Sequence, residues 1–179
     1  MITGEIIKTS TNKTIEVFDN AISFDTQTKI FEIINGFRYT INGAEYAGQN
    51  LRQIIGTKCS KQDVENFGFL AEPKISEILE KYEFKEVTQA RVNVSNCAEY
   101  NSPHTDGSRF TLLYYASLEW NISWAGQTLF LDDSLEKVEY CSLYKPGKII
   151  VFDSTIPHLI VTPTIHAKSY RFSFVLQFI

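Results

Sequence analysis

The second half of this 179-residue chain contains short runs of β-branched and aromatic residues that follow one another at close spacing. Such runs predict strands, and segments such as WAGQ, DDS and KPGK between them predict chain reversals. The expected strands are 87–94, 110–118, 127–132, 137–143, 148–153, 158–162 and 169–178. So many short strands at this spacing favour a jelly-roll sandwich.

The first 85 residues have a different pattern, with apolar residues at helical spacing. FDTQTKIFEIINGF predicts one helix, with Asp25 as its N-cap and Gly36 near its end. SKQDVENFGFLAEPKISEILEKY predicts two further helical segments. The first opens with a capping-box pair, Ser60 and Asp63, and the second begins at Pro73.

The polar segment RYTINGAEYAGQN lies between these helices and predicts a hairpin or a loop. Two interpretations of residues 38–58 remain open. The segment is either an ordinary surface hairpin or a lid that turns Arg38 and Tyr46 toward a substrate.

These patterns predict a mainly β fold with a helical N-terminal third, namely a double-stranded β-helix (jelly roll) buttressed by helices. We expect one domain over residues 1–179, in which 1–85 supply helical support and substrate-side elements and 86–179 form the core. An immunoglobulin-like sandwich is the alternative, and the helical third disfavours it.

Composition indicates which partners and which cellular compartment to expect. A net charge of −4 and a pI near 5.4, without a block of Lys or Arg, argue against a nucleic-acid partner. No apolar run is long enough to predict a membrane span, and MITGEIIKTS lacks the features of a signal peptide. The scattered cysteines Cys59, Cys97 and Cys141 predict free thiols, and hence a cytoplasmic protein.

The stretch SPHTDGS places His104 two positions before Asp106, so in extended backbone the two side chains share a face. The pair is either part of a metal site or a polar turn with a solvated imidazole. A facial metal site needs a second histidine from elsewhere in the chain. His158, which follows the apolar run in VFDSTIPH, is the expected third ligand, in preference to His166 in the loop-like TPTIHAKS.

The last strand, SYRFSFVLQF, alternates between an apolar set and a mostly polar set. Arg171 and Ser173 therefore share one face, while the aromatic side chains occupy the other. The polar face either meets water or lines a barrel interior. In an interior, a planar guanidinium binds a carboxylate through two hydrogen bonds.

Residues 91–178 resemble the catalytic core of the iron(II)/2-oxoglutarate-dependent dioxygenases, and within them the prolyl 4-hydroxylase-like branch. The resemblance rests on three motifs in order: HTDGSRFTLLYYASLEWNISWAGQTLFLDD, YKPGKIIVFDSTIPH and YRFSF. One departure is Ala125, which replaces the first glycine of a Gly-Gly turn. The N-terminal 85 residues do not match the family's substrate elements.

The resemblance assigns roles to individual positions. His104, Asp106 and His158 match the iron ligands, and Arg171 matches the residue that pairs with the distal carboxylate of 2-oxoglutarate. Further positions expected at the cosubstrate are Ser173, which assists Arg171, Tyr115 as a hydroxyl donor, Leu113 as a pocket wall, and Asn93. For Tyr115 and Asn93 a purely structural role remains an equal or stronger alternative.

The resemblance implies an enzyme that uses Fe(II), 2-oxoglutarate and O2, with ascorbate as reductant, and releases succinate and CO2. The expected acceptor is a prolyl or other side chain of a protein or peptide, and the near alternative is a free amino acid or small metabolite. A nucleic-acid demethylase is disfavoured, because the last strand lacks that group's second arginine. Alternatives of other kinds are an inactive jelly-roll binding module and a zinc or manganese enzyme of the cupin type. The oligomeric state stays open.

Overall fold

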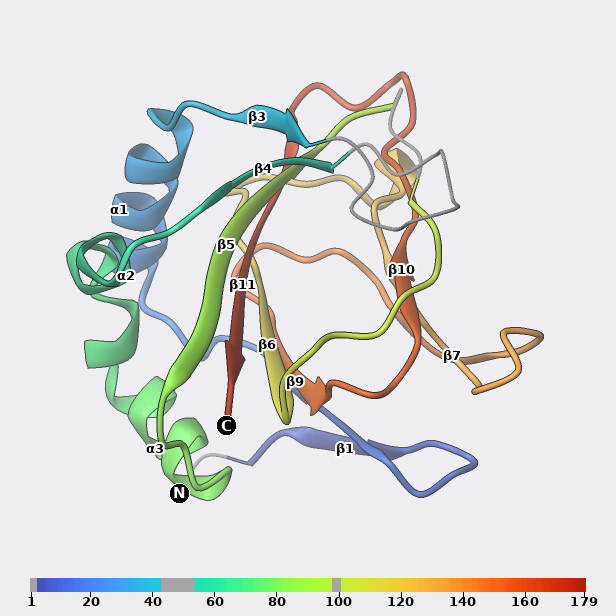
Figure 1. Cartoon of the computed structure of the whole chain (residues 1–179). Coiled ribbons are helices and arrows are strands. Elements are labelled where there is room, and N and C mark those ends of the chain that lie inside the picture. Colours follow the sequence, from blue (N-terminus) through green and yellow to red (C-terminus); the bar gives the residue numbers. More distant parts are fainter. Residues whose placement is uncertain (1–2, 43–53, 98–100) are drawn as a thin grey trace.

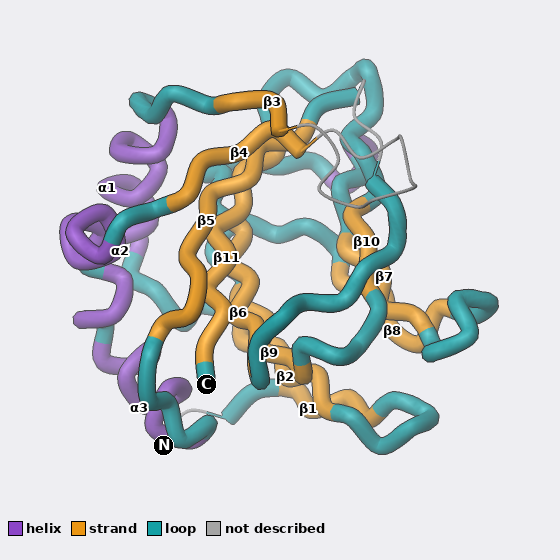
Figure 2. The backbone as a smooth tube through the Cα atoms, in the orientation of Figure 1, coloured by secondary structure: helices purple, strands orange, loops and turns teal. Residues whose placement is uncertain are grey.

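The computed structural model describes residues 3–42, 54–97 and 101–179, with only the backbone for residues 41, 42 and 54. Two antiparallel sheets face each other, and helices cover the outer side of the larger one (Figures 1 and 2). The larger sheet has the strand order β1-β2-β9-β6-β11-β5-β4-β3, and the smaller one β10-β7-β8. This arrangement is a jelly roll buttressed by helices, which confirms the predicted fold class.

The seven strands predicted in the second half are all present. Their bounds are β5 Val87–Ser95, β6 Phe110–Tyr115, β7 Thr128–Leu131, β8 Val138–Ser142, β9 Ile149–Asp153, β10 His158–Ile160 and β11 Arg171–Phe178. Strand β11 lies at the centre of the larger sheet between β5 and β6. From Ser173 onward, each side chain on its inner face has a neighbour on both flanking strands, whereas Arg171 has one on β5 alone.

Two N-terminal strands, β1 Glu5–Lys8 and β2 Thr14–Phe18, were not predicted. They form a hairpin closed by Thr9 to Lys13, with Asn12 at a φ of 63°, and β2 pairs with β9. Strand β1 is exposed at the sheet edge, so alternation of polar and apolar residues is weak there. The turn signal around Asn12 was the available clue.

The three predicted helices are α1 Phe24–Asn35, α2 Lys61–Phe67 and α3 Pro73–Lys81, with 3₁₀ turns η1 Phe69–Ala71 and η2 Ile122–Trp124. The capping box of Ser60 and Asp63 and the start at Pro73 are confirmed. The predicted N-cap Asp25 is wrong. Ser23 is the last extended residue and its side chain accepts from the amide of Thr26, so Asp25 already lies in the first turn.

The segment between α1 and α2 contributes two strands to the edge of the larger sheet, β3 Thr40–Asn42 and β4 Ile54–Lys58. They pair antiparallel, with Thr40 opposite Gly56, and β4 also pairs with β5. Arg38 is exposed just before β3. Residues 43–53, including Tyr46, lie outside the described residues, so the lid stays a prediction.

Two apolar cores lie on opposite faces of the larger sheet. One fills the space between the sheet and the helices and includes Phe67, Phe69 and Phe174, with ring centroids of the first two 5.2 and 5.3 Å from that of Phe174. The other lies between the two sheets and includes Tyr115 and Phe130. The larger sheet is therefore buried on both faces in its centre, and the inner core adjoins the candidate site.

None of the helices in the described part of the chain is long and apolar enough to cross a membrane. The three cysteines are free thiols, as the sequence predicted.

Candidate metal centre

The two histidines of the site are held by reciprocal backbone hydrogen bonds. The amide of His104 donates to the carbonyl of His158 over 3.0 Å, and the amide of His158 donates back over 2.9 Å. His104 thereby lies beside β10 as a single antiparallel bridge, although 54 positions separate it from His158 in sequence. This pairing brings the two imidazole centroids to 4.3 Å.

Asp106 is fixed through both its backbone and its side chain. Its amide donates to the carbonyl of Ser154 over 2.9 Å. One carboxylate oxygen, Oδ2, accepts a hydrogen bond of 2.6 Å from the hydroxyl of Thr111 on β6. The Thr111 hydroxyl also lies 2.9 Å from that of Ser154, which in turn lies 2.9 Å from that of Ser108. This hydroxyl network orients the carboxylate before any ligand binds.

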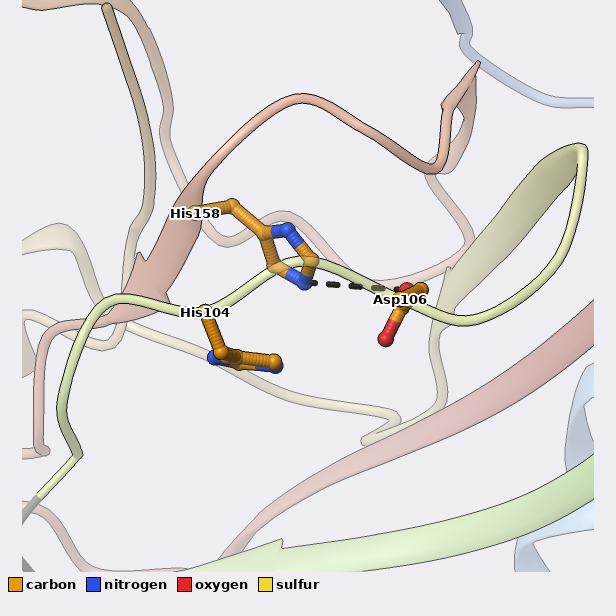
Figure 3. A group of neighbouring side chains, drawn as sticks. All are labelled: His104, Asp106 and His158. Carbon is orange, nitrogen blue, oxygen red and sulfur yellow. Dashed lines mark ion pairs between the residues drawn. The ribbon is translucent and has the colours of Figure 1, made fainter. Parts of the chain in front are cut away.

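The ligand atoms of His104, Asp106 and His158 all lie within 4.8 Å of one another, and His158 Nε2 is 3.8 Å from Asp106 Oδ2 (Figure 3). Each ring turns its Nδ1 toward the backbone carbonyl two residues earlier, at 3.2 Å for His104 and 3.0 Å for His158. An Nδ1–H that donates there leaves Nε2 as the metal-binding nitrogen. The structure thus brings together the two predicted histidines and the predicted carboxylate.

His166, the competing histidine, lies exposed in the turn before β11 and is not part of this cluster. Two imidazole nitrogens and one carboxylate oxygen, converging from one side, are the donor set of the non-heme Fe(II) sites that leave three positions open. The arrangement of these three side chains therefore suits a divalent metal of that kind.

Arg171 is the largest fully buried side chain of the described chain. Its guanidinium donates to the carbonyl of Gly126 over 2.7 Å, to the Thr128 hydroxyl over 3.2 Å and to the Ser173 hydroxyl over 3.3 Å. Of the described acidic residues, none forms an ion pair with it. A buried cation without a carboxylate partner is costly, so this position favours an anionic ligand.

Two tyrosines flank the guanidinium without supplying a negative charge. The Arg171 guanidinium carbon is 5.1 Å from the ring centroid of Tyr115 and 4.8 Å from that of Tyr144. Burial raises the pKa of the Tyr144 hydroxyl to about 12, although Arg171 opposes the shift. Burial likewise raises the pKa of Tyr115. Both phenols are therefore neutral at physiological pH, and the positive charge of Arg171 is left unbalanced.

The remaining predicted residues line the same inner face of the sheet. Ser173 is fully buried beside Arg171, and Leu113 is buried between Thr111 and Tyr115 on β6. The Tyr115 hydroxyl donates to the Thr128 hydroxyl over 2.9 Å. Asn93 on β5 lies opposite Ser173, and its buried Oδ1 has no hydrogen-bond partner among the described residues.

Several residues of the site were not singled out from the sequence. Thr111 was missed, although FTLLYY places it on the face of Leu113 and Tyr115, which was a usable signal. Gly126 was missed as the carbonyl that holds Arg171. A Cβ there would lie 2.9 Å from the Trp120 ring and 3.3 Å from Arg171 Cδ, and its φ is +83°, so glycine is required. Ala125, at the position where the resemblance led us to expect a glycine, adopts φ 60° and ψ −135°.

No protein-family model and no curated protein matches the chain by sequence. Solved structures match it in fold. A prolyl hydroxylase from Trichoplax adhaerens, in complex with a hypoxia inducible factor oxygen degradation domain peptide fragment, has a TM-score of 0.69 at 14% identity over 92% of this chain and 82% of that one.

Two further structures match over similar lengths. An oxidoreductase of the 2OG-Fe(II) oxygenase family from Burkholderia pseudomallei has a TM-score of 0.70 at 10% identity, covering 94% of this chain and 85% of that one. The non-heme alpha ketoglutarate dependent epimerase SnoN from nogalamycin biosynthesis has a TM-score of 0.65 at 10% identity, covering 92% and 77%. The chain thus has the fold of the 2OG-Fe(II) oxygenases, prolyl hydroxylases among them.

Proposed function

We propose that the protein is an Fe(II)- and 2-oxoglutarate-dependent dioxygenase that hydroxylates an unactivated C–H bond. In this reaction one atom of O2 enters the product C–OH, the other enters succinate, and 2-oxoglutarate loses CO2. The observation that carries the proposal is the convergence of His104, Asp106 and His158 between the same two sheets that enclose the uncompensated charge of Arg171.

His104, Asp106 and His158 would hold the iron, which supplies the oxidising chemistry when bound. The chain's own part is to keep these ligands in position. The reciprocal backbone bonds of the histidines fix both rings, and Thr111 holds the Asp106 carboxylate through Oδ2. Because these contacts are made within the protein, little reorganisation is required on metal binding.

Arg171 would bind the distal carboxylate of 2-oxoglutarate, with the hydroxyls of Ser173 and Thr128 beside it. Both hydroxyls already accept from the guanidinium, so they orient it. The Tyr115 hydroxyl donates to Thr128, and its ring lies against the Arg171 guanidinium. Leu113 would form an apolar wall of the pocket. The tyrosine thus supports the anchor through Thr128, a more indirect role than the direct contact expected from the resemblance.

The first test is spectroscopic. Anaerobic addition of Fe(II) and 2-oxoglutarate should produce a weak visible charge-transfer band in the wild-type protein, and none in His104→Ala. Arg171→Leu should bind Fe(II) as the wild type does but need at least tenfold more 2-oxoglutarate to develop the band. His166→Ala is the matched control, because this histidine is exposed and outside the cluster.

The outcomes separate the competing classes. Absence of the band in the wild type would favour an inactive binding module. Metal binding with activity that is independent of 2-oxoglutarate would favour a zinc or manganese enzyme of the cupin type. A normal 2-oxoglutarate requirement in Arg171→Leu would place the anchor elsewhere, with Lys168 the first residue to examine.

Two acceptor classes are carried forward: a prolyl or other side chain of a protein or peptide, and a free amino acid or small metabolite. The structures that match in fold include both a prolyl hydroxylase with a bound peptide fragment and an epimerase of nogalamycin biosynthesis. Ascorbate is the proposed reductant that keeps the iron ferrous. Succinate release measured with each acceptor class, with and without ascorbate, tests both points.

A further inference from the structure

A second arginine, Arg91, lies on the inner face of the larger sheet and has no role in the site described so far. It pairs across β5 and β11 with Val175, and Val175 pairs with Leu113 on β6. Directly opposed residues share a face of a sheet. Val175 packs into the core between the two sheets. Arg91 therefore lies on the inner face of the larger sheet, the same face as Thr111, which holds Asp106.

The register places Arg91 at the level of the metal centre. Thr111, which holds Asp106, lies in the adjacent cross-strand row, opposite Gln177. Arg171 lies opposite Ser95, four positions along β5 from Arg91. At strand spacing, the Cα atoms of the two arginine positions are therefore about 13 Å apart along the sheet. Arg91 is thus too far away to duplicate the proposed 2-oxoglutarate anchor.

Arg91 is half-buried and forms no ion pair within the described part of the chain. Its Nε is shielded from solvent and has no hydrogen-bond partner, and none of the described acidic residues pairs with its guanidinium. Buried polar groups of folded proteins are nearly always satisfied, so a cationic donor without a partner, on the sheet face that carries the site, indicates a ligand. Its neighbour across β4 is Lys58, a second cation.

Asn93, two positions along on the same face, presents the complementary group. Its buried Oδ1 is an acceptor that no described residue donates to. Both side chains lie against Gly56 on β4, where a Cβ would be 2.8 Å from Asn93 Oδ1 and 3.1 Å from Arg91 Nε. Glycine at this position leaves the space that the two side chains occupy, and the pair forms one donor-and-acceptor unit.

The charge on this face is one-sided. The described side chains that β4, β5, β6 and β11 turn toward the smaller sheet include Lys58, Arg91 and Arg171 but no Asp or Glu. Asp106, the carboxylate of the metal site, would be bound to the metal. The face therefore suits two carboxylate ligands, one at each arginine.

We propose that the acceptor substrate is a free α-amino acid whose carboxylate binds Arg91 and whose amino or imino N–H donates to Asn93 Oδ1. This inference rests on the proposed function and selects between its two acceptor classes. In an α-amino acid the carboxylate and the nitrogen are attached to the same carbon. This spacing suits a cation, Arg91, next to an acceptor, Asn93 Oδ1. A residue inside a peptide has lost that carboxylate, so it cannot pair with the arginine.

The test uses the twenty standard L-amino acids, each with Fe(II), 2-oxoglutarate and ascorbate, and measures succinate release above the rate without acceptor. At least one free amino acid should stimulate release, and its carboxamide should not. Arg91→Gln should raise the KM for that amino acid at least tenfold, with the KM for 2-oxoglutarate unchanged. Arg91→Lys should recover part of the lost affinity, because lysine keeps the positive charge but cannot form the two parallel hydrogen bonds of a guanidinium.

Arg109→Gln is the matched control, since this arginine is exposed, stacks on Phe110 and pairs only with Glu83. Binding supplies a readout independent of turnover. Saturation-transfer NMR on the metal-free protein should detect the stimulating amino acid in the wild type and in Arg109→Gln, and not in Arg91→Gln. The acid-against-amide comparison uses wild-type protein, so it stands even if a variant fails to fold.

Several results would overturn the inference while leaving the proposed function intact. These are stimulation by internal peptide residues but by no free amino acid, equal activity of acid and carboxamide, or a raised KM for 2-oxoglutarate in Arg91→Gln. Loss of the charge-transfer band and of acceptor-free turnover in the wild type would instead remove the proposed function, and the inference with it.

Discussion

The two faces of strand β11 are both buried, yet they are built from opposite chemistry. The outer face consists of apolar side chains that pack against the helices: Phe172, Phe174, Leu176 and Phe178. The inner face begins with Arg171 and Ser173, held by hydrogen bonds. Because the outer face depends on volume and the inner face on directed polar contacts, we expect changes on one to alter stability and changes on the other to alter ligand affinity.

The largest effect on stability is expected from Phe174→Ala on the outer face. The ring is fully buried and makes edge contacts with Phe67 and Phe69. Its removal should lower the free energy of unfolding by about 3–5 kcal/mol. Urea unfolding measures the loss, with Phe174→Leu as the volume-conserving control that should lose less than about 1.5 kcal/mol. A loss below that value in the alanine variant would mean that the outer core is not the main source of stability.

A smaller effect, and one on affinity, is expected from Thr111→Val on the inner face. Valine keeps the shape of the side chain but removes the 2.6 Å hydrogen bond to Asp106 Oδ2. Loss of such a supporting contact typically weakens metal binding by roughly 10–100-fold. Titration with Fe(II) or Mn(II) measures the change, and Thr88→Val, an exposed threonine on β5, should bind metal like the wild type. Unaltered metal affinity in Thr111→Val would mean that the Thr111 hydroxyl does not support metal binding.

The same contrast explains what the sequence could reveal. Strands of the second half were predictable because alternation and turn residues agree, and the alternation of β11 correctly separated Arg171 from its apolar neighbours. The sequence left open whether the polar face of β11 meets water or lines a barrel interior. Arg171 and Ser173 are fully buried, so this face lines the interior. Strands β1 and β2 were missed for two different reasons: β1 is exposed at the sheet edge and has no apolar alternation, and β2 contains Glu16, which is buried only through its ion pair with Lys81.

Only those residues of the site that stand in sequence motifs could be predicted. His104, Asp106 and His158 stand in recognisable segments, whereas Arg91 reads as an ordinary polar residue of a strand. Its relevance depends on register, because only the pairing of β5 with β11 and of β11 with β6 brings it to the level of Thr111. Cross-strand pairing joins residues that are distant in sequence, and local patterns do not encode it.

The smallest effect, and the sharpest test of independence between the faces, is expected from Ser60→Ala at the start of α2. This change removes the capping bond to the Asp63 amide and should cost about 1 kcal/mol of unfolding free energy. Helix α2 carries Phe67, which packs on the outer face of β11, so the weakened helix should lower stability alone. Ser60→Thr should retain most of the cap, and the 2-oxoglutarate requirement should match that of the wild type in both variants. A raised requirement in Ser60→Ala would show that strain passes through β11 from its apolar face to Arg171, and that the two faces are coupled.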